Sequence, residues 1–204
     1  MRIFGRSPEK STSGESLGIR IHEDDWGMRN LYPVQAFVEV QGDLDQSIQA
    51  SIDNRADNGI GWTAVHLIEH PANDYAAVGL ELRAASLALE ALLPRVTNFT
   101  ATAMSGFGDK KDPLGSYETD AYCFGFDASC FIKLDPIDDV VKAAWFECRT
   151  ADAAKLSGLR SGLLAINQLV PSVVADYWLH VGGLIGDAEF LQAYLEQLRE
   201  SAMP

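Results

Sequence analysis

The spacing of apolar residues near the beginning of the chain predicts two strands followed by a helix. Residues 17–21 alternate between aliphatic side chains and small or polar ones, a period of two that is typical of a half-buried strand. A second strand is predicted near Val34–Val40. Leucine and isoleucine then recur at every fourth residue, which predicts a helix over 43–56 with Asp43 as its N-cap.

The middle of the chain has mainly the character of a sheet. A broad apolar stripe predicts a helix over 79–93, which Pro94 ends. Residues 135–139 predict the start of another helix, because carboxylates stabilise a first helical turn. The glycine-rich stretch 104–116 predicts a long loop. The predicted strands are Trp62–His70, Val96–Ala103, Ala121–Phe126, Cys130–Leu134 and Ala143–Arg149.

The C-terminal third is predicted to be helical. We expect helices over 151–169, in the segment after Pro171, and over 188–200, where Asp187 is the N-cap. Strands and helices are mixed in the first two thirds of the chain, and helices cluster in the last third. This order favours an α+β fold. We therefore expect a single α+β domain over 17–204, with a mixed or mostly antiparallel sheet covered by helices. The apolar late helices are also compatible with a homo-oligomer.

The beginning of the chain and its cysteines predict a cytoplasmic protein outside the membrane. Residues 1–16 are predicted to be a flexible N-terminal leader, because they include a long run without apolar side chains and no secretory signal. The longest uncharged apolar stretch, 161–175, has 15 residues, whereas crossing a bilayer takes roughly 20. The three cysteines are odd in number, form no C-x-x-C pair and lie in apolar surroundings, which predicts buried reduced thiols.

The formal net charge of −13 limits the classes of partner. Nucleic acids and anionic membranes need cationic surface, so we expect neither as a partner. Two segments hold most of the charge: 41–82 has one basic and seven acidic residues, and 112–152 has three basic and nine acidic residues. If these segments share one face, they favour an acidic interface for a basic protein.

The pentapeptide His66-Leu67-Ile68-Glu69-His70 is an H-x-x-E-H motif. On a helix, His66 and His70 would share a face and bind one zinc ion, and Glu69 would act as general base on the bound water. The motif resembles that of the inverzincin metallopeptidases, the insulysin and pitrilysin type. That resemblance implies a zinc peptidase with a downstream glutamate as third ligand, for which Glu147 is the candidate.

The surrounding sequence favours a strand instead of a helix for this motif. Residues 62–65 favour β structure, and Pro71 disfavours helical conformation at His70. In a strand the two histidines share one face while Glu69 points to the other, which separates the base from the metal.

A second candidate site is the acidic loop Glu23-Asp24-Asp25-Trp26. Three carboxylates and an aromatic side chain suit contact with a basic partner, because aromatic residues often anchor interfaces. The alternative is a solvated turn after the first strand.

Two functions from different classes follow. The first is a non-catalytic, acidic cytoplasmic protein that binds a basic protein partner, as immunity-type inhibitors of cationic toxins do, with no cofactor. The second is a zinc-dependent hydrolase that uses His66, Glu69 and His70. Metal content separates them.

Overall fold

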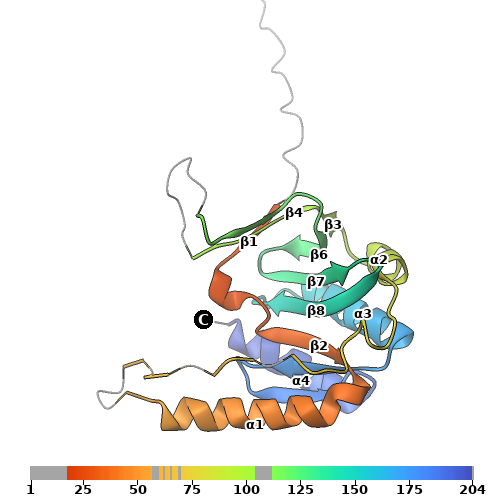
Figure 1. The fold of residues 1–204 in the computed structure, drawn as a ribbon. Coiled ribbons are helices and arrows are strands. Elements are labelled where there is room, and N and C mark those ends of the chain that lie inside the picture. Colours follow the sequence, from red (N-terminus) through yellow and green to blue (C-terminus); the bar gives the residue numbers. More distant parts are fainter. Residues whose placement is uncertain are drawn as a thin grey trace, which may run out of the picture.

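The computed structural model describes residues 18–56, 60–61, 63–64, 66–68, 70–103 and 112–203. Within them, a large sheet of seven strands has the order β10-β9-β2-β8-β7-β6-β3, and every neighbouring pair is antiparallel (Figure 1). Its strands are β2 (Arg29–Pro33), β3 (Arg95–Val96), β6 (Tyr122–Asp127), β7 (Cys130–Ile137), β8 (Val140–Cys148), β9 (Ser172–Asp176) and β10 (Val181–Leu184).

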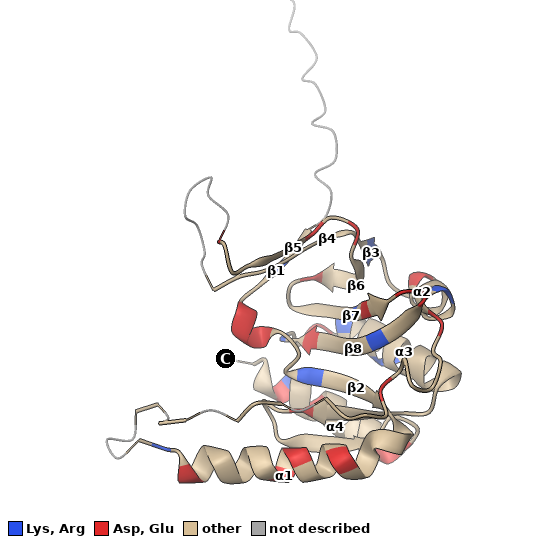
Figure 2. Ribbon diagram, in the orientation of Figure 1, with Lys and Arg blue, Asp and Glu red and all other residues tan. Residues whose placement is uncertain are grey.

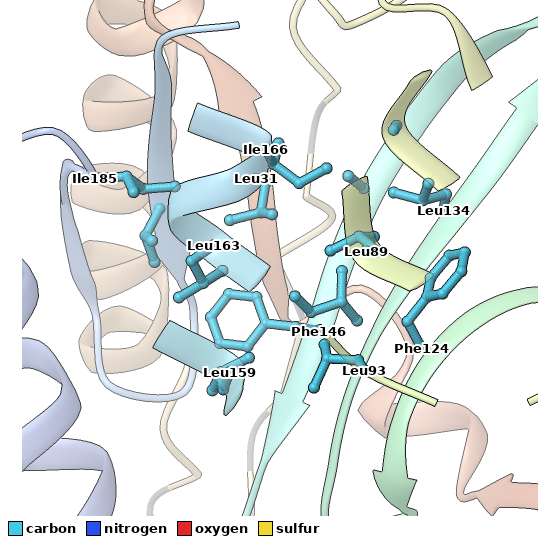
Figure 3. Close-up of a cluster of buried hydrophobic side chains, with 14 of the residues drawn as sticks. Leu31, Leu89, Leu93, Phe124, Leu134, Phe146, Leu159, Leu163, Ile166 and Ile185 are labelled. Atoms are coloured by element: carbon cyan, nitrogen blue, oxygen red, sulfur yellow. The ribbon is translucent and has the colours of Figure 1, made fainter. Parts of the chain in front are cut away.

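Three helices cover one face of the large sheet: α2 (Leu82–Glu90), α3 (Ala153–Leu169) and α4 (Ala188–Ser201). Alternate residues of the central strands point toward these helices, as Ile132 and Phe146 do, and form the main core with them. Figure 3 shows Leu159, Leu163 and Ile166 of α3 directed at this cluster. The helical stripes read from the sequence therefore face the sheet.

The opposite face is divided between α1 (Phe37–Asp53) and a small sheet of β1 (Gly18–Ile21), β4 (Asn98–Ala101) and β5 (Ser116–Glu118). The small sheet packs over β6, β7 and β8 through a second core that includes Phe99, Phe131 and Trp145. α1 packs over β9 and β10 through a third core. The fold is thus α+β and mostly antiparallel as expected, with one parallel pair, β1 and β4.

The strand predicted near Val34–Val40 is wrong. After a 3-10 turn, η2 (Val34–Ala36), the chain enters α1 at Phe37, so the helix begins six residues before the predicted N-cap Asp43. The apolar residues of this stretch fit helical spacing as well, since Val40 and Leu44 are both buried against β9. Packing against β9 therefore selected the helical spacing of these apolar residues over the strand spacing.

The helix predicted after Pro171 is also wrong, because β9 and β10 form a hairpin there, between α3 and α4. All five residues of β9 are buried, since helices cover both of its faces. A strand buried on both faces shows no alternation of apolar and polar residues, so its sequence resembles that of a buried helix.

Two further predictions differ from the structure. Residues 135–139 do not start a helix: 135–137 are the end of β7, and Asp138 and Asp139 form the turn to β8, where Asp138 has a positive φ of 52°. The described residues of the predicted strand Trp62–His70 are in neither strand nor helix, and Trp62, Val65 and Glu69 lie outside the description. The predicted leader 1–16 and most of the predicted loop, 104–111, also lie outside it.

No helix in the described part of the chain is both long enough and apolar enough to span a bilayer.

Candidate functional site

The described residues 66–68 and 70–71 run across one face of the large sheet, between α1 and the small sheet (Figure 1). They include His66, which is partly buried, and His70, which is exposed. Neither histidine lies on a helix, so the face-sharing geometry that the H-x-x-E-H motif needs is not formed by the described residues.

His66 is held by the carboxylate of Asp43 on α1. Nε2 of His66 lies 2.8 Å from Oδ1 of Asp43, and the Tyr177 hydroxyl donates a hydrogen bond to the other oxygen, Oδ2. The Asp43 side chain is only 11% exposed and that of His66 19%. The three residues come from α1, the crossing segment and the end of β9, so this contact fixes the segment over the sheet.

Two tyrosines lie below this contact. Burial raises the pKa of Tyr177, and the hydrogen bond to Asp43 and the neighbouring Tyr32 raise it further. Burial, and then the Asp43 carboxylate, likewise raise the pKa of Tyr32. Both hydroxyls therefore remain protonated at neutral pH. The Tyr177 hydroxyl donates to Asp43, whereas the buried Tyr32 hydroxyl has no hydrogen-bond partner among the described residues. Tyr32 also packs edge-on against His70, with ring centroids 6.5 Å apart.

A groove of about 320 Å³ lies along α1 beside this cluster. Its lining includes the carboxylates of Glu39 and Asp43, the amide of Gln46 and the imidazole of His70. Gly42 also lines the groove, and a Cβ placed there would have no atom within 4 Å. Packing does not require this mid-helix glycine, which leaves the groove open beside two negative groups.

Other hollows on the molecule differ in character. A hollow of about 560 Å³ beside α2 is lined by residues of both charges. Among them Arg95 is already paired with Asp120 at 3.1 Å and lies over the Tyr122 ring. A smaller one of about 150 Å³ lies on the other side of His70, against Trp26 and Trp145. Among the described residues, the groove on α1 is lined by two carboxylates, Glu39 and Asp43, and by no lysine or arginine, whereas the smaller hollow has a single carboxylate, Asp135.

The three predicted zinc ligands do not come together. Glu147 is 1% exposed and accepts a hydrogen bond from Nη1 of Arg29, while His66 is bound to Asp43. Across the described residues, no group of three or more His, Cys, Asp or Glu side chains is arranged to hold a metal ion. Glu69, the predicted base, lies outside the description.

Glu147 belongs instead to a buried charged cluster at one end of the large sheet. Arg29 donates through Nη1 to Glu147 and through Nε to Asp176, and the Tyr194 hydroxyl donates to Asp176 at 2.8 Å. Burial raises the pKa of Glu147, and Arg29 acts in the opposite direction. Each oxygen of Asp176 accepts two hydrogen bonds, which gives this cluster a structural role.

The predicted partner loop, Glu23–Trp26, is divided between surface and core. Glu23 and Asp24 are exposed on the 3-10 turn η1 (Glu23–Asp25). Asp25 pairs with Arg149 at 2.8 Å. Trp26 is only partly exposed, because its ring stacks on Trp145 at 5.7 Å. The loop therefore exposes the carboxylates of Glu23 and Asp24, of which Asp24 lies 3.4 Å from Nδ1 of His22, and its aromatic side chain supports the small sheet.

The two acidic segments also differ in how their charge is compensated. In 112–152, five carboxylates form ion pairs with lysine or arginine: Glu118, Asp120, Asp127, Asp135 and Glu147. α1 contains four acidic residues and no basic one, and Figure 2 shows red but no blue segments along it. Within the described chain, no lysine or arginine pairs with Glu39, Asp45 or Asp53.

The sequence identified His66 and His70 but not the partners that they have. Asp43 is predicted to cap a helix, yet it lies inside α1, and its second partner, Tyr177, is 134 residues away in the sequence. The buried charged cluster could have been suspected from a charged residue that follows an apolar run, as Asp176 follows Ser172–Ala175.

Comparisons with protein-family models, with curated proteins and with solved structures gave no match.

Proposed function

We propose that this protein is a non-catalytic cytoplasmic binding protein whose α1 face captures a basic segment of another protein. The observation that carries the proposal is the uncompensated charge of α1: Glu39, Asp45 and Asp53 have no cationic partner among the described residues. Immunity-type inhibitors, which neutralise cationic proteins, represent one form of such a function.

The shape of α1 supports a protein partner. Two large apolar side chains, Val38 and Ile52, are 83% and 64% exposed on the outer side of this helix. With Gly42, Asp45 and Gln49 they follow one stripe, because residues three and four apart share a helix face. Apolar contacts with carboxylates between them suit a basic, amphipathic segment of a partner.

The groove beside this stripe suits a single cationic side chain. Glu39 and Asp43 are one helical turn apart on the same face of α1 and both line the groove, so a guanidinium or ammonium group that enters there meets the Glu39 carboxylate beside the negative charge of Asp43, whose oxygens already bind His66 and Tyr177. A guanidinium can donate paired hydrogen bonds to carboxylates, and such charge-assisted bonds are stronger than neutral ones. We therefore expect arginine to be preferred over lysine at this position.

Charge reversal on α1, measured against matched reversals elsewhere, tests the proposal. Asp45→Lys/Asp53→Lys alters α1, Glu23→Lys/Asp24→Lys alters the predicted loop, and Glu189→Lys/Glu200→Lys alters α4. All six positions are exposed, and the three variants have the same net charge. Binding of a fluorescently labelled arginine–glycine repeat peptide is measured by anisotropy at low and physiological salt.

We expect the α1 variant to bind the peptide at least about fivefold more weakly than the α4 variant, and binding to weaken as salt rises. Equal losses in the α1 and α4 variants would show that only net charge matters. A loss confined to Glu23→Lys/Asp24→Lys would assign binding to the loop instead of α1.

A further inference from the structure

Cys130 and Cys148 are directly opposite each other in the β7–β8 pair. Their neighbours define the type of pair: the N–H of Arg149 donates to the carbonyl of Ser129 at 2.7 Å, so residues 129 and 149 form a hydrogen-bonded pair. Because the two kinds of pair alternate along an antiparallel ladder, 130 and 148 form a non-hydrogen-bonded pair.

This kind of pair brings two side chains close enough for a covalent bond. Opposed Cα atoms in non-hydrogen-bonded pairs are about 4.5 Å apart, which lies within the range of about 4.4–6.8 Å that disulfides span. Cys130 and Cys148 both belong to the main core, so their side chains point to the same face of the sheet. The backbone therefore needs no rearrangement for the two sulfur atoms to bond.

The surroundings make the two thiols chemically unequal. The adjacent Cys130 thiol lowers the pKa of Cys148 against the opposing effect of burial, and the backbone N–H of Thr150 and the charge of Arg29 lower it further. The same contact, together with burial, raises the pKa of Cys130, whose sulfur lies 3.6 Å from the Lys155 carbonyl. Cys148 is thus the thiol of the pair that loses its proton more readily.

We propose that Cys130 and Cys148 form a redox-active dithiol, which a peroxide oxidises to a cross-strand disulfide. The Cys148 thiolate attacks one peroxide oxygen, becomes a sulfenic acid and releases water after protonation. The Cys130 sulfur then attacks the Cys148 sulfur, and the hydroxyl leaves as a second water. Two thiols lose two electrons and one hydrogen peroxide is reduced to two waters.

Access to the pair is through the first turn of α3. Both cysteines are 1% exposed, and the Cys130 thiol lies against the carbonyl of Lys155 in that turn. A helix terminus opens locally more easily than the rest of the core, and hydrogen peroxide is small. We therefore expect oxidation to proceed on the folded protein, with hydrogen peroxide faster than with a large disulfide reagent.

Cys123 is a matched internal control. It is also buried, at 0% exposure, but it lies in the core under the small sheet, where Lys133 is its opposite residue on β7. Burial raises its pKa to about 12. It has neither a thiol partner across the strand nor thiolate character, so we expect it to remain reduced under the same treatment.

The experiment treats the full chain with a small excess of hydrogen peroxide, then denatures it, alkylates free thiols and determines the mass of the protein and its peptides. We expect free thiols to fall from three to one and the mass before alkylation to fall by about 2 Da. A disulfide-linked peptide that joins Cys130 to Cys148 should appear. No species with a disulfide between two chains should form.

Variants then assign the two steps. Cys123→Ser should oxidise like the wild type, whereas Cys130→Ala should stop at a Cys148 sulfenic acid that dimedone labels. Three free thiols after treatment of the wild type, or a disulfide that includes Cys123, would overturn the proposal. The wild-type result does not depend on the folding of any variant, and it is independent of whether α1 binds a basic partner.

Discussion

Arg29 and Asp176 form an ion pair inside the protein, with Nε of Arg29 2.9 Å from Oδ2 of Asp176 and with 6% and 0% of their side chains exposed. The pair joins β2 to β9 at their first register position, and Glu147 and Tyr194 complete its hydrogen bonds. Taking these charges out of water is costly, so the cluster is stable only while every partner is present.

Removing one partner of this cluster should be strongly destabilising. We expect Asp176→Ala to lower the free energy of unfolding by about 3–5 kcal/mol, because it leaves the Arg29 charge buried with only Glu147 as counterion. Tyr194→Phe removes one hydrogen bond to the same carboxylate and should cost about 1–2 kcal/mol. Urea unfolding measures both losses. Equal losses of unfolding free energy in the two variants would show that the ion pair stabilises the protein no more than the tyrosine hydrogen bond does.

Two glycines should respond to alanine in opposite directions. At Gly42 an added methyl meets open space inside a helix, so Gly42→Ala should stabilise the protein by about 0.5–1 kcal/mol. At Gly125 a Cβ would lie 2.4 Å from the carbonyl oxygen of Cys130, so Gly125→Ala should cost about 1–3 kcal/mol or more. Thermal unfolding of both variants checks this.

The same substitution at Gly42 should weaken binding of the arginine–glycine peptide, because the methyl group would lie in the groove that Glu39 and Asp43 also line. A stabilised protein with unchanged affinity would show that the groove takes no part in binding.

The stability of the protein at acid pH should depend on Asp127. Hydrogen bonds from Lys155 and then from Ser129 lower the pKa of this carboxyl to about 2. Since the folded pKa lies below that of the unfolded chain, near 3.9, the stabilisation is complete above the unfolded pKa. It is lost as pH falls from about 4 through about 2.

We therefore expect Asp127→Asn to lose less unfolding free energy than the wild type between pH 6 and pH 2.5, as measured by urea unfolding at each pH. Lys155→Met, which removes the first of these partners, should reduce the pH dependence in the same direction. Parallel curves for wild type and both variants would contradict the assignment.

Metal content separates the binding protein from the zinc hydrolase. With His66 bound to Asp43 and Glu147 bound to Arg29, we expect purified protein to contain well under one zinc per chain. Unfolding should be unaffected by a chelator. Stoichiometric zinc that His66→Ala abolishes would instead support the hydrolase, and mass spectrometry of the metal measures it directly.

Elements with a clear period were predictable because their own residues determine them. The apolar stripe of 79–93 became α2 (Leu82–Glu90), and Asp187 caps α4 as expected, with its carboxylate accepting from the N–H groups of Glu189 and Phe190. The strands Ala121–Phe126, Cys130–Leu134 and Ala143–Arg149 correspond to β6, β7 and β8. Capping and amphipathic spacing act within a few residues, so no tertiary information was needed.

Short apolar runs were decided by what packs against them. Part of Val34–Val40 belongs to α1 because Val40 and Leu44 pack against β9. The apolar run after Pro171 is β9 because β2 and β10 pair with it, one along each edge. The sequence contains the apolar residues in both cases, but their period is ambiguous over so few positions. Burial on both faces removed the alternation that would have identified the strand.

The sequence by itself determined the α+β class, the strong acidic charge and the presence of His66, His70 and three cysteines. Only the tertiary structure decided which of these groups meet. Asp43 and His66 are 23 residues apart, Arg29 and Asp176 are 147 apart, and Cys130 meets Cys148 through strand register. Such contacts depend on long-range pairing and on the exclusion of water, which no local pattern of residues records.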